Sequence, residues 1–175
     1  MTENQLHNMV NFTILAGGYT SFIASYLFNS DANSLTLLTQ SPTGPSPSWI
    51  TSHPTNKSIL YAVNEVSAGT LQSFTINSNG SLNRPSDQIS SGGSGPAFAS
   101  PLSSGPVVVL NYGSGNGEII PTSDALHFAS NTTFITFPPP VGNMSHPHMA
   151  LQHDAEIFVP DLVNQYPQWH LFRQF

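Results

Sequence analysis

Two histidines separated by one proline, His146 and His148, are the residues of this chain best placed to act together chemically. Side chains two positions apart on an extended strand point the same way, so both imidazoles can bind one ligand or exchange a proton with it. A metal ion would need further ligands; Glu65 or Asp161 could supply one, although nothing in the sequence places them nearby. The structural alternative is a tight turn at Pro147 in which one imidazole hydrogen-bonds the backbone.

Two of the acidic residues, Glu65 and Asp161, each follow an apolar segment. At such a place a side chain emerges from the core at the end of a strand. A carboxylate at such a place could act as a general base, or it could be an ordinary turn acid that binds loop amides. For Asp161 the turn-acid interpretation is the stronger one, because Asn64 and Asn111 occupy the corresponding positions in the sequence. Glu65 has no acidic counterpart, which makes it the stronger catalytic candidate.

The elements that position these residues are short strands. The stretch 47–91 predicts an antiparallel sheet of four strands separated by turn residues. An extended segment follows Pro47, an apolar run spans residues 59–63, an alternating segment surrounds Phe74, and a last strand is expected around Leu82. Such a sheet has two apolar faces, so neighbouring units must cover them.

The same unit recurs at a spacing of about fifty residues, the range of propeller-type repeats. Three landmarks recur in register: an opening proline (Pro47, Pro96, Pro147), a polar residue closing an apolar run (Asn64, Asn111, Asp161) and an apolar residue in the next strand (Phe74, Ile119, Leu171). We predict one all-β domain over residues 1–175, with units near 10–45, 46–92, 95–135 and 145–175. The first unit shows three strands and no recognisable innermost one. A β-sandwich with ordinarily spaced strands is the alternative.

Composition excludes several classes of function. Charged residues make up only 7% of the chain and aromatic residues 10%, whereas disordered chains usually combine high net charge with few aromatics. The net charge of -6 leaves no basic patch for a phosphate backbone. No apolar run approaches the ~20 residues of a membrane span. We therefore expect neither nucleic acid nor a membrane as a partner.

The amino terminus lacks the basic segment and apolar core of a signal peptide, so we expect a cytoplasmic protein. The chain has no cysteine, which excludes disulfides. No Gly-x-Ser-x-Gly elbow lies on a strand-to-helix turn, which argues against a serine hydrolase of that type. We expect no cofactor and no resident metal ion.

An ordered set of motifs carries a family resemblance. In sequence order these are Gly17-Gly18-Tyr19, Pro47-Ser48-Trp49, Leu60-Tyr61-Ala62-Val63-Asn64-Glu65, Ser90-Ser91-Gly92-Gly93, Asn111-Tyr112-Gly113-Ser114-Gly115, His146-Pro147-His148 and Val159-Pro160-Asp161-Leu162. Together they resemble the lactonase family of seven-bladed β-propellers, which includes 6-phosphogluconolactonase and the fungal carboxy-cis,cis-muconate cyclase. Pro-Ser-Trp and Val-Pro-Asp-Leu make the fungal branch the closer match. Family members run to about twice this length, so the resemblance covers their amino-terminal half.

The resemblance implies a truncated β-propeller of roughly three and a half four-stranded blades and an activity on lactones. It implies Glu65, His146 and His148 as catalytic residues, with Glu65 or His148 as the base. Asn111, Asp161 and Tyr19 are implied as substrate-binding residues. His127 and His170 lie outside the matched motifs, and replacing them is expected to do little. If the chain resembles a fungal family member outside central sugar metabolism, we expect it to act in a secondary-metabolite pathway.

Three functions remain open at this level. The first is hydrolysis of a lactone; a phosphorylated sugar lactone is a poor candidate, because the chain has only three bases, Lys57, Arg84 and Arg173. The second is a non-catalytic shortened propeller that completes its ring with another chain, since open strand edges favour homo-oligomers. The third is a muconate-type cycloisomerase that forms a lactone from an unsaturated acid. The expected ligand is thus a small lactone or unsaturated acid.

Overall fold

The structure, a computed structural model, describes residues 10–138, 144–162 and 168–173, and these contain strands and no helix. Four antiparallel sheets follow one another along the chain, and we number them blades 1 to 4. Blade 1 consists of β1 (Asn11–Ala16), β2 (Phe22–Asn29) and β3 (Ser34–Pro42). Blade 2 consists of β4 (Ile50–Ser52), β5 (Ile59–Asn64), β6 (Thr70–Thr75) and β7 (Asp87–Ser90).

Blade 3 contains β8 (Pro96–Pro101), β9 (Val107–Asn111), β10 (Asn116–Ile120) and, as its outer strand, β13 (Thr133–Thr136). A separate two-stranded pair, β11 (Thr122–Asp124) with β12 (His127–Phe128), is inserted before β13. Blade 4 contains β14 (Leu151–His153), β15 (Glu156–Asp161) and β16 (Gln168–Arg173). No helix in the described part of the chain could cross a membrane.

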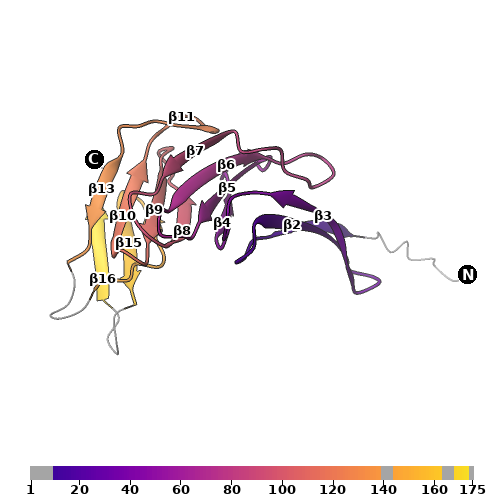
Figure 1. Cartoon of the computed structure of the whole chain (residues 1–175), viewed down its shortest axis with the longest axis horizontal. Helices are drawn as coiled ribbons and strands as arrows, with labels where there is room; N and C mark the ends of the chain where they lie inside the picture. The colour runs from indigo at the N-terminus through magenta and orange to yellow at the C-terminus, as the bar shows by residue number, and fades with distance from the viewer. Residues whose placement is uncertain (1–9, 139–143, 163–167, 174–175) are drawn as a thin grey trace, which may run out of the picture.

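The blades succeed one another around an arc, with β4 and β8 on its concave side and β7 and β13 on its convex side (Figure 1). This arrangement confirms the all-β partial propeller predicted from the sequence. In the described residues blade 1 lacks a strand inside β1, and blade 4 lacks a strand outside β16. The described chain therefore forms part of a ring.

One backbone hydrogen bond recurs in blades 2, 3 and 4 and confirms the predicted repeat. The residue after each second strand donates to the connector that precedes the innermost strand: Glu65 N to Ser46 O (2.9 Å), Tyr112 N to Gly95 O (2.9 Å) and Leu162 N to His146 O (3.1 Å). Asn64, Asn111 and Asp161 accordingly end β5, β9 and β15 at equivalent positions.

Residues of blade 1 can be matched to those of blade 2 through another recurring backbone hydrogen bond. Ser46 N donates to Thr20 O (2.6 Å), just as Gly95 N donates to Val66 O (2.9 Å). Thr20 is therefore the counterpart of Val66, and counting back makes Gly18 the counterpart of Asn64. Tyr19 then corresponds to Glu65.

The hydrophobic core of the described residues consists of three clusters, one between each pair of consecutive blades. Ile23 of blade 1 packs on Leu60 and Phe74 of blade 2. The second strands of blades 2 and 3 are buried on both faces. Successive side chains of each strand therefore pack into different clusters. Tyr61 of β5 joins Val107 and Val109 in the cluster between blades 2 and 3, and Leu110 of β9 joins Ile157 in the cluster between blades 3 and 4. Each blade is thus stabilised by its neighbours.

The outer strand of blade 2 differs from the prediction. It begins at Asp87, and Leu82 makes only an isolated bridge with Ile76. The side chain of Asn79 accepts the backbone N–H of Ser81 (3.0 Å) in a tight turn, and the N–H of Leu82 donates to Ser41 Oγ of blade 1 (2.8 Å). Leu82 is therefore buried between the blades, where it joins the first core cluster.

Candidate functional site

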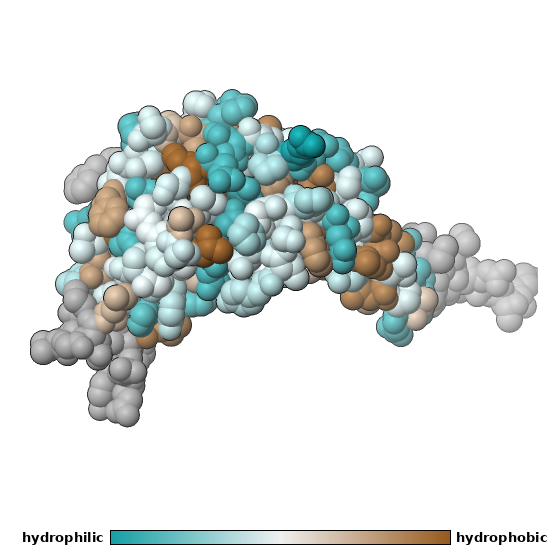
Figure 2. All heavy atoms as spheres, in the orientation of Figure 1, coloured by the Kyte–Doolittle hydropathy of each residue, from teal (hydrophilic) through white to brown (hydrophobic). Residues whose placement is uncertain are grey.

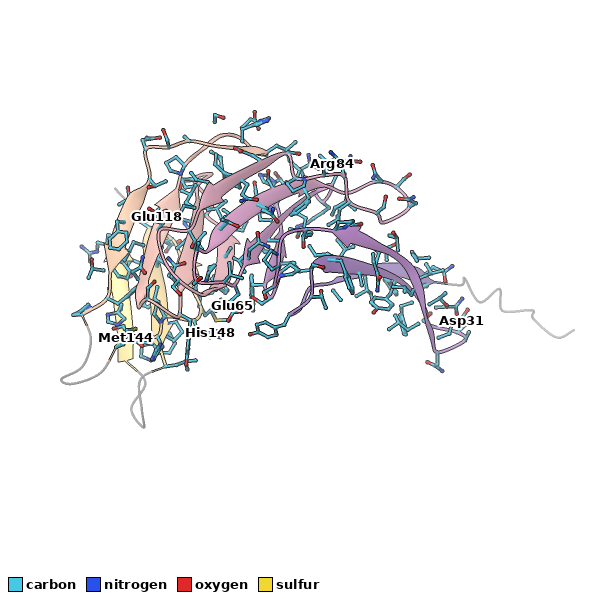
Figure 3. All side chains as sticks on the ribbon, viewed as in Figure 1. Asp31, Glu65, Arg84, Glu118, Met144 and His148 are labelled. Carbon is cyan, nitrogen blue, oxygen red and sulfur yellow. The ribbon has the colours of Figure 1, made fainter. Side chains whose placement is uncertain are left out.

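The candidate site is a rim at one end of the blades. We define the rim as the residues that follow the second strands, Tyr19, Glu65, Tyr112 and Leu162, together with His146 and His148 of the last connector. The second strands of all blades run in the same direction, so these residues emerge at the same end. Glu65 and His148 both lie along the concave edge of the arc (Figure 3).

A close backbone approach positions the rim of blade 1. Gly18 N donates to Pro47 O at 2.9 Å. A Cβ atom at Gly17 would lie 2.1 Å from the same oxygen, closer than real Cβ contacts allow. Glycine is required there so that the end of β1 can meet the connector of blade 2. This contact fixes the start of the loop that carries Tyr19.

Tyr19 and Glu65 interact across the boundary between blades 1 and 2. The hydrogen bond of the phenol with the Glu65 carboxylate, helped by the negative charge of that carboxylate, raises the pKa of Tyr19 above its usual 10.0. The phenol is therefore the donor and Glu65 the acceptor. Tyr19 is 77% exposed, so this carboxylate–phenol pair is open to a ligand at the rim.

His146 is held in one tautomer by the neighbouring blade. Its Nδ1 lies 2.9 Å from the backbone oxygen of Tyr112, and because a carbonyl only accepts, Nδ1 must carry the proton. Nε2 of the neutral ring then has a free lone pair. The ring stacks on that of Tyr112 with centroids 4.4 Å apart, and His148 meets the same tyrosine edge-on at 5.8 Å. One tyrosine thus brings both predicted catalytic histidines together.

Asp161 anchors this arrangement from within the core. It is fully buried, and its Oδ1 accepts the backbone N–H of His146 at 2.6 Å. Its Oδ2 lies 3.1 Å from Nε2 of His170, whose ring packs against Phe137. Asp161 therefore positions His146 through the connector that carries it.

The equivalent residues in blades 2 and 3 also bind a connector, but as hydrogen-bond donors, whereas Asp161 accepts. Asn64 Nδ2 donates to Pro45 O (3.0 Å), and Asn111 Nδ2 donates to Ser91 O (2.7 Å). Asn111, like Asp161, has no exposed surface. Both were predicted to bind substrate; in the structure both side chains are buried and contact the connectors. The common cause is the repeat, in which a polar side chain joins the second strand of blades 2, 3 and 4 to a connector.

His170 belongs to the cluster around Asp161 although it lies outside every motif in the sequence. It enters the cluster through the pairing of β15 with β16, in which Val159 lies opposite His170. No motif or short spacing marks such a cross-strand contact. Predicting the contact between His170 and Asp161 would have required the correct strand register of the last sheet.

All three basic side chains lie away from the rim. Lys57 precedes β5 and donates to the backbone oxygen of His53 (3.2 Å), whereas Arg173 pairs with Glu156 at the start of β15 (3.3 Å). Arg84 lies between β6 and β7, on the opposite edge from Glu65 and His148 in Figure 3. The rim offers a base, a carboxylate and a phenol, but no lysine or arginine among the described residues.

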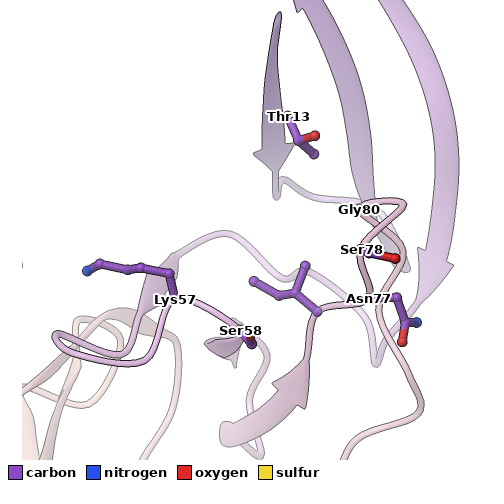
Figure 4. Close-up of a pocket in the computed structure, with 7 residues that line it drawn as sticks. Thr13, Lys57, Ser58, Asn77, Ser78 and Gly80 are labelled. Carbon is purple, nitrogen blue, oxygen red and sulfur yellow. The ribbon is translucent and has the colours of Figure 1, made fainter.

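A groove of about 390 Å³ lies between blades 1 and 2, at the end opposite to the rim. Its lining includes Thr13, Lys57, Ser58 and Ser78. Lys57 extends away from the polar groups of the facing hairpin (Figure 4), so these groups do not converge on one ligand. Within the described residues, no three His, Cys, Asp or Glu side chains group together to hold a metal ion.

The fold and the rim define a partial propeller with acid–base side chains at one end of its blades. A match to the family described as "Lactonase, 7-bladed beta-propeller" covers residues 13–164. The chain belongs to this lactonase family of seven-bladed β-propellers. No curated protein matches the chain significantly.

Solved structures agree with this fold. The periplasmic gluconolactonase PpgL of Pseudomonas aeruginosa is 21% identical with a TM-score of 0.82, over 94% of this chain and 50% of that one. A candidate 6-phosphogluconolactonase from Bacteroides fragilis is 20% identical with a TM-score of 0.81, over 93% of this chain and 48% of that one. Another from Bacteroides uniformis is 19% identical with a TM-score of 0.73, over 93% and 53%. The chain thus spans about half the length of these structures.

Proposed function

We propose that the rim hydrolyses uncharged lactones, with His146 as the general base. The observation that carries this proposal is the hydrogen bond from His146 Nδ1 to the backbone oxygen of Tyr112, which leaves Nε2 free to accept a proton. Family membership supports the reaction class. The tautomer makes His146 a better base than either residue to which the sequence pointed, Glu65 or His148.

The reaction needs one water molecule and returns the histidine to its starting state. Nε2 of His146 takes a proton from water while the water oxygen bonds to the carbonyl carbon of the lactone. The electron pair of the C=O bond moves to oxygen, and its return breaks the ring C–O bond. The leaving ring oxygen then takes the proton from the imidazolium, which gives the open hydroxy acid. In this scheme Glu65 orients the water and His148 hydrogen-bonds the carbonyl oxygen, where negative charge develops.

The charge distribution supports an uncharged substrate. A phosphate or a second carboxylate is usually bound by arginine or lysine, and the three basic side chains all lie away from the rim. A phosphorylated sugar lactone or a muconate-type diacid would therefore lack a partner in these residues. A rim without lysine or arginine among the described residues favours hydrolysis of a neutral lactone over the cycloisomerase alternative.

The test is lactone turnover by matched histidine variants. His146→Gln removes the base and should lower kcat/KM by roughly 10²–10⁴. Glu65→Gln should also lower it, because a neutral amide oxygen accepts from water more weakly than a carboxylate does. His127→Gln is the control, since His127 contacts Asp124 in the inserted pair and lies outside the rim. Equal losses in the control and the rim variants, or no turnover by the wild-type chain, would reject the proposal and favour the non-catalytic alternative.

A further inference from the structure

The chain contains two Asn-Gly dipeptides, Asn79-Gly80 and Asn116-Gly117, and the structure places them in opposite surroundings. In such a pair the asparagine side chain can react with its own backbone, because glycine has no Cβ to hinder approach to its nitrogen. Asn79 is exposed in the turn between β6 and β7, whereas Asn116 begins β10 and is 6% exposed. Mostly hydrophilic and near-neutral residues cover the loop between β6 and β7 (Figure 2), so water reaches this turn.

Two donors of Ser81 hold the side-chain oxygen of Asn79. The backbone N–H of Ser81 donates to Oδ1 at 3.0 Å, and the Ser81 hydroxyl donates to the same oxygen at 2.7 Å. Donors aimed at a carbonyl oxygen stabilise the negative charge that develops there when a nucleophile attacks the carbonyl carbon. Ser81 therefore activates the side-chain amide of Asn79 toward attack by the nitrogen of Gly80.

Asn116 is restrained at both its side chain and its backbone. Its Nδ2 donates to Gly92 O at 3.1 Å, which holds the nitrogen that would leave. β10 pairs with β9 on one side and with β13 on the other, so rotating the peptide between Asn116 and Gly117 would disrupt the sheet. In the turn, the N–H of Gly80 donates to Asn77 O at 2.9 Å, and local opening of a surface turn releases such a bond at small cost.

We propose that Asn79 is a site of spontaneous deamidation in the folded protein, with water as the co-reactant and Ser81 as the activating residue. The nitrogen of Gly80 gives its proton to water and bonds to Cγ of Asn79. The Cγ–Nδ2 bond breaks, and the leaving nitrogen takes up a proton from water and departs as ammonia. Water then adds to the cyclic imide: opening at Cγ gives aspartate at position 79, and opening at the backbone carbonyl gives isoaspartate.

The modification acts on the contact between blades 1 and 2. The backbone oxygen of Gly80 accepts the hydroxyl of Ser25, and a Cβ atom at Gly80 would lie 2.7 Å from Cγ2 of Thr13, so the turn fits closely against blade 1 (Figure 4). Isoaspartate adds a methylene group to the main chain next to Gly80, which displaces Gly80 from these partners. Aspartate keeps the main chain and can still accept both donors of Ser81, so it should leave the contact intact.

The experiment incubates the purified chain at mildly alkaline pH and follows its proteolytic peptides by mass spectrometry, in which deamidation adds about 1 Da. Chromatography separates the aspartate and isoaspartate products. Asn79 should convert about 100-fold or more faster than Asn116 in the folded chain, because opening a strand costs far more than opening a turn. In urea, which removes the fold, the two rates should converge. The isoaspartate form should melt at a lower temperature than the Asn79→Asp protein, which carries the same charge on an unaltered main chain.

Variants of Ser81 test the activation. Ser81→Ala removes the hydroxyl donor and should slow conversion of Asn79 about 5-fold, the factor that one hydrogen bond typically contributes, whereas Ser81→Thr keeps the donor and should convert like wild type. Ser78→Ala is the control, because Ser78 is exposed in the same turn and is not one of the two donors to Asn79. Equal rates at Asn79 and Asn116 in the folded chain, an intact Asn79 where the urea-denatured chain converts, or a Ser81→Ala rate at or above that of the control would each overturn the proposal. Thermal melts check folding, and the comparison of the two asparagines needs no variant.

Discussion

Replacing Asp161 by alanine should destabilise the chain by about 3 kcal/mol, because two buried donors would each lose an acceptor at about 1–3 kcal/mol apiece. These donors are the backbone N–H of His146 and the Nε2–H of His170, at 2.6 and 3.1 Å from the carboxylate. The expected loss is smaller than the largest possible sum of the two penalties. The reason is that His170 can move its proton to Nδ1, which leaves no unpaired donor at Nε2. Asp161→Asn should cost only about 1 kcal/mol, because it keeps an acceptor for His146 and asparagine fills this position in blades 2 and 3.

Urea denaturation at one low protein concentration measures these changes, with the slope of the transition checked for constancy. In a chain of this size, a loss of 3 kcal/mol should also lower the melting temperature by about 6–12 °C. Asp31→Ala, at an exposed turn, is the control and should stay within about 0.5 kcal/mol. An Asp161→Ala protein as stable as wild type would refute the positioning role. If Asp161→Asn costs as much as Asp161→Ala, the charge matters and not the hydrogen bonds.

Two further predictions concern the connectors and the rim. Glu65→Ala should return the pKa of Tyr19 toward its usual 10.0, so its phenol should ionise at lower pH than in the wild type; NMR titration of labelled tyrosine measures this, and an unchanged curve would contradict the contact. Ser46 has a φ of 54°, and its counterpart Gly95 has a φ of 62°. Ser46→Gly should therefore relieve about 1 kcal/mol of strain and raise the melting temperature by about 2–4 °C, whereas a lower melting temperature would contradict this equivalence.

The repeat was predictable from sequence because its landmarks are local. A proline, an apolar run and a closing polar residue recur at a fixed spacing, and Asn64, Asn111 and Asp161 do end equivalent strands. Leu82 was wrongly predicted to lie in the outer strand of blade 2. An apolar side chain is expected to be buried, but its character does not reveal against which surface. That surface belongs to blade 1 and is distant in sequence.

The candidate site was predictable only in part. His146 and His148 share a motif, and both meet Tyr112. The side chain of Asp161 reaches His170 through cross-strand geometry that no motif encodes. That replacing His170 does little to the rate of lactone hydrolysis stays a prediction. We also expect its loss to destabilise the chain, because it would leave a buried carboxylate with one donor fewer.

The central claim is that this propeller carries a lactone-hydrolysing rim without a cationic subsite. The direct measurement is kcat/KM of the purified chain for a neutral δ-lactone and for the same lactone carrying a phosphate. The account predicts turnover of the neutral lactone and a lower kcat/KM for the phosphorylated one, because no arginine or lysine among the described residues reaches the rim. A preference for the phosphorylated lactone would contradict it.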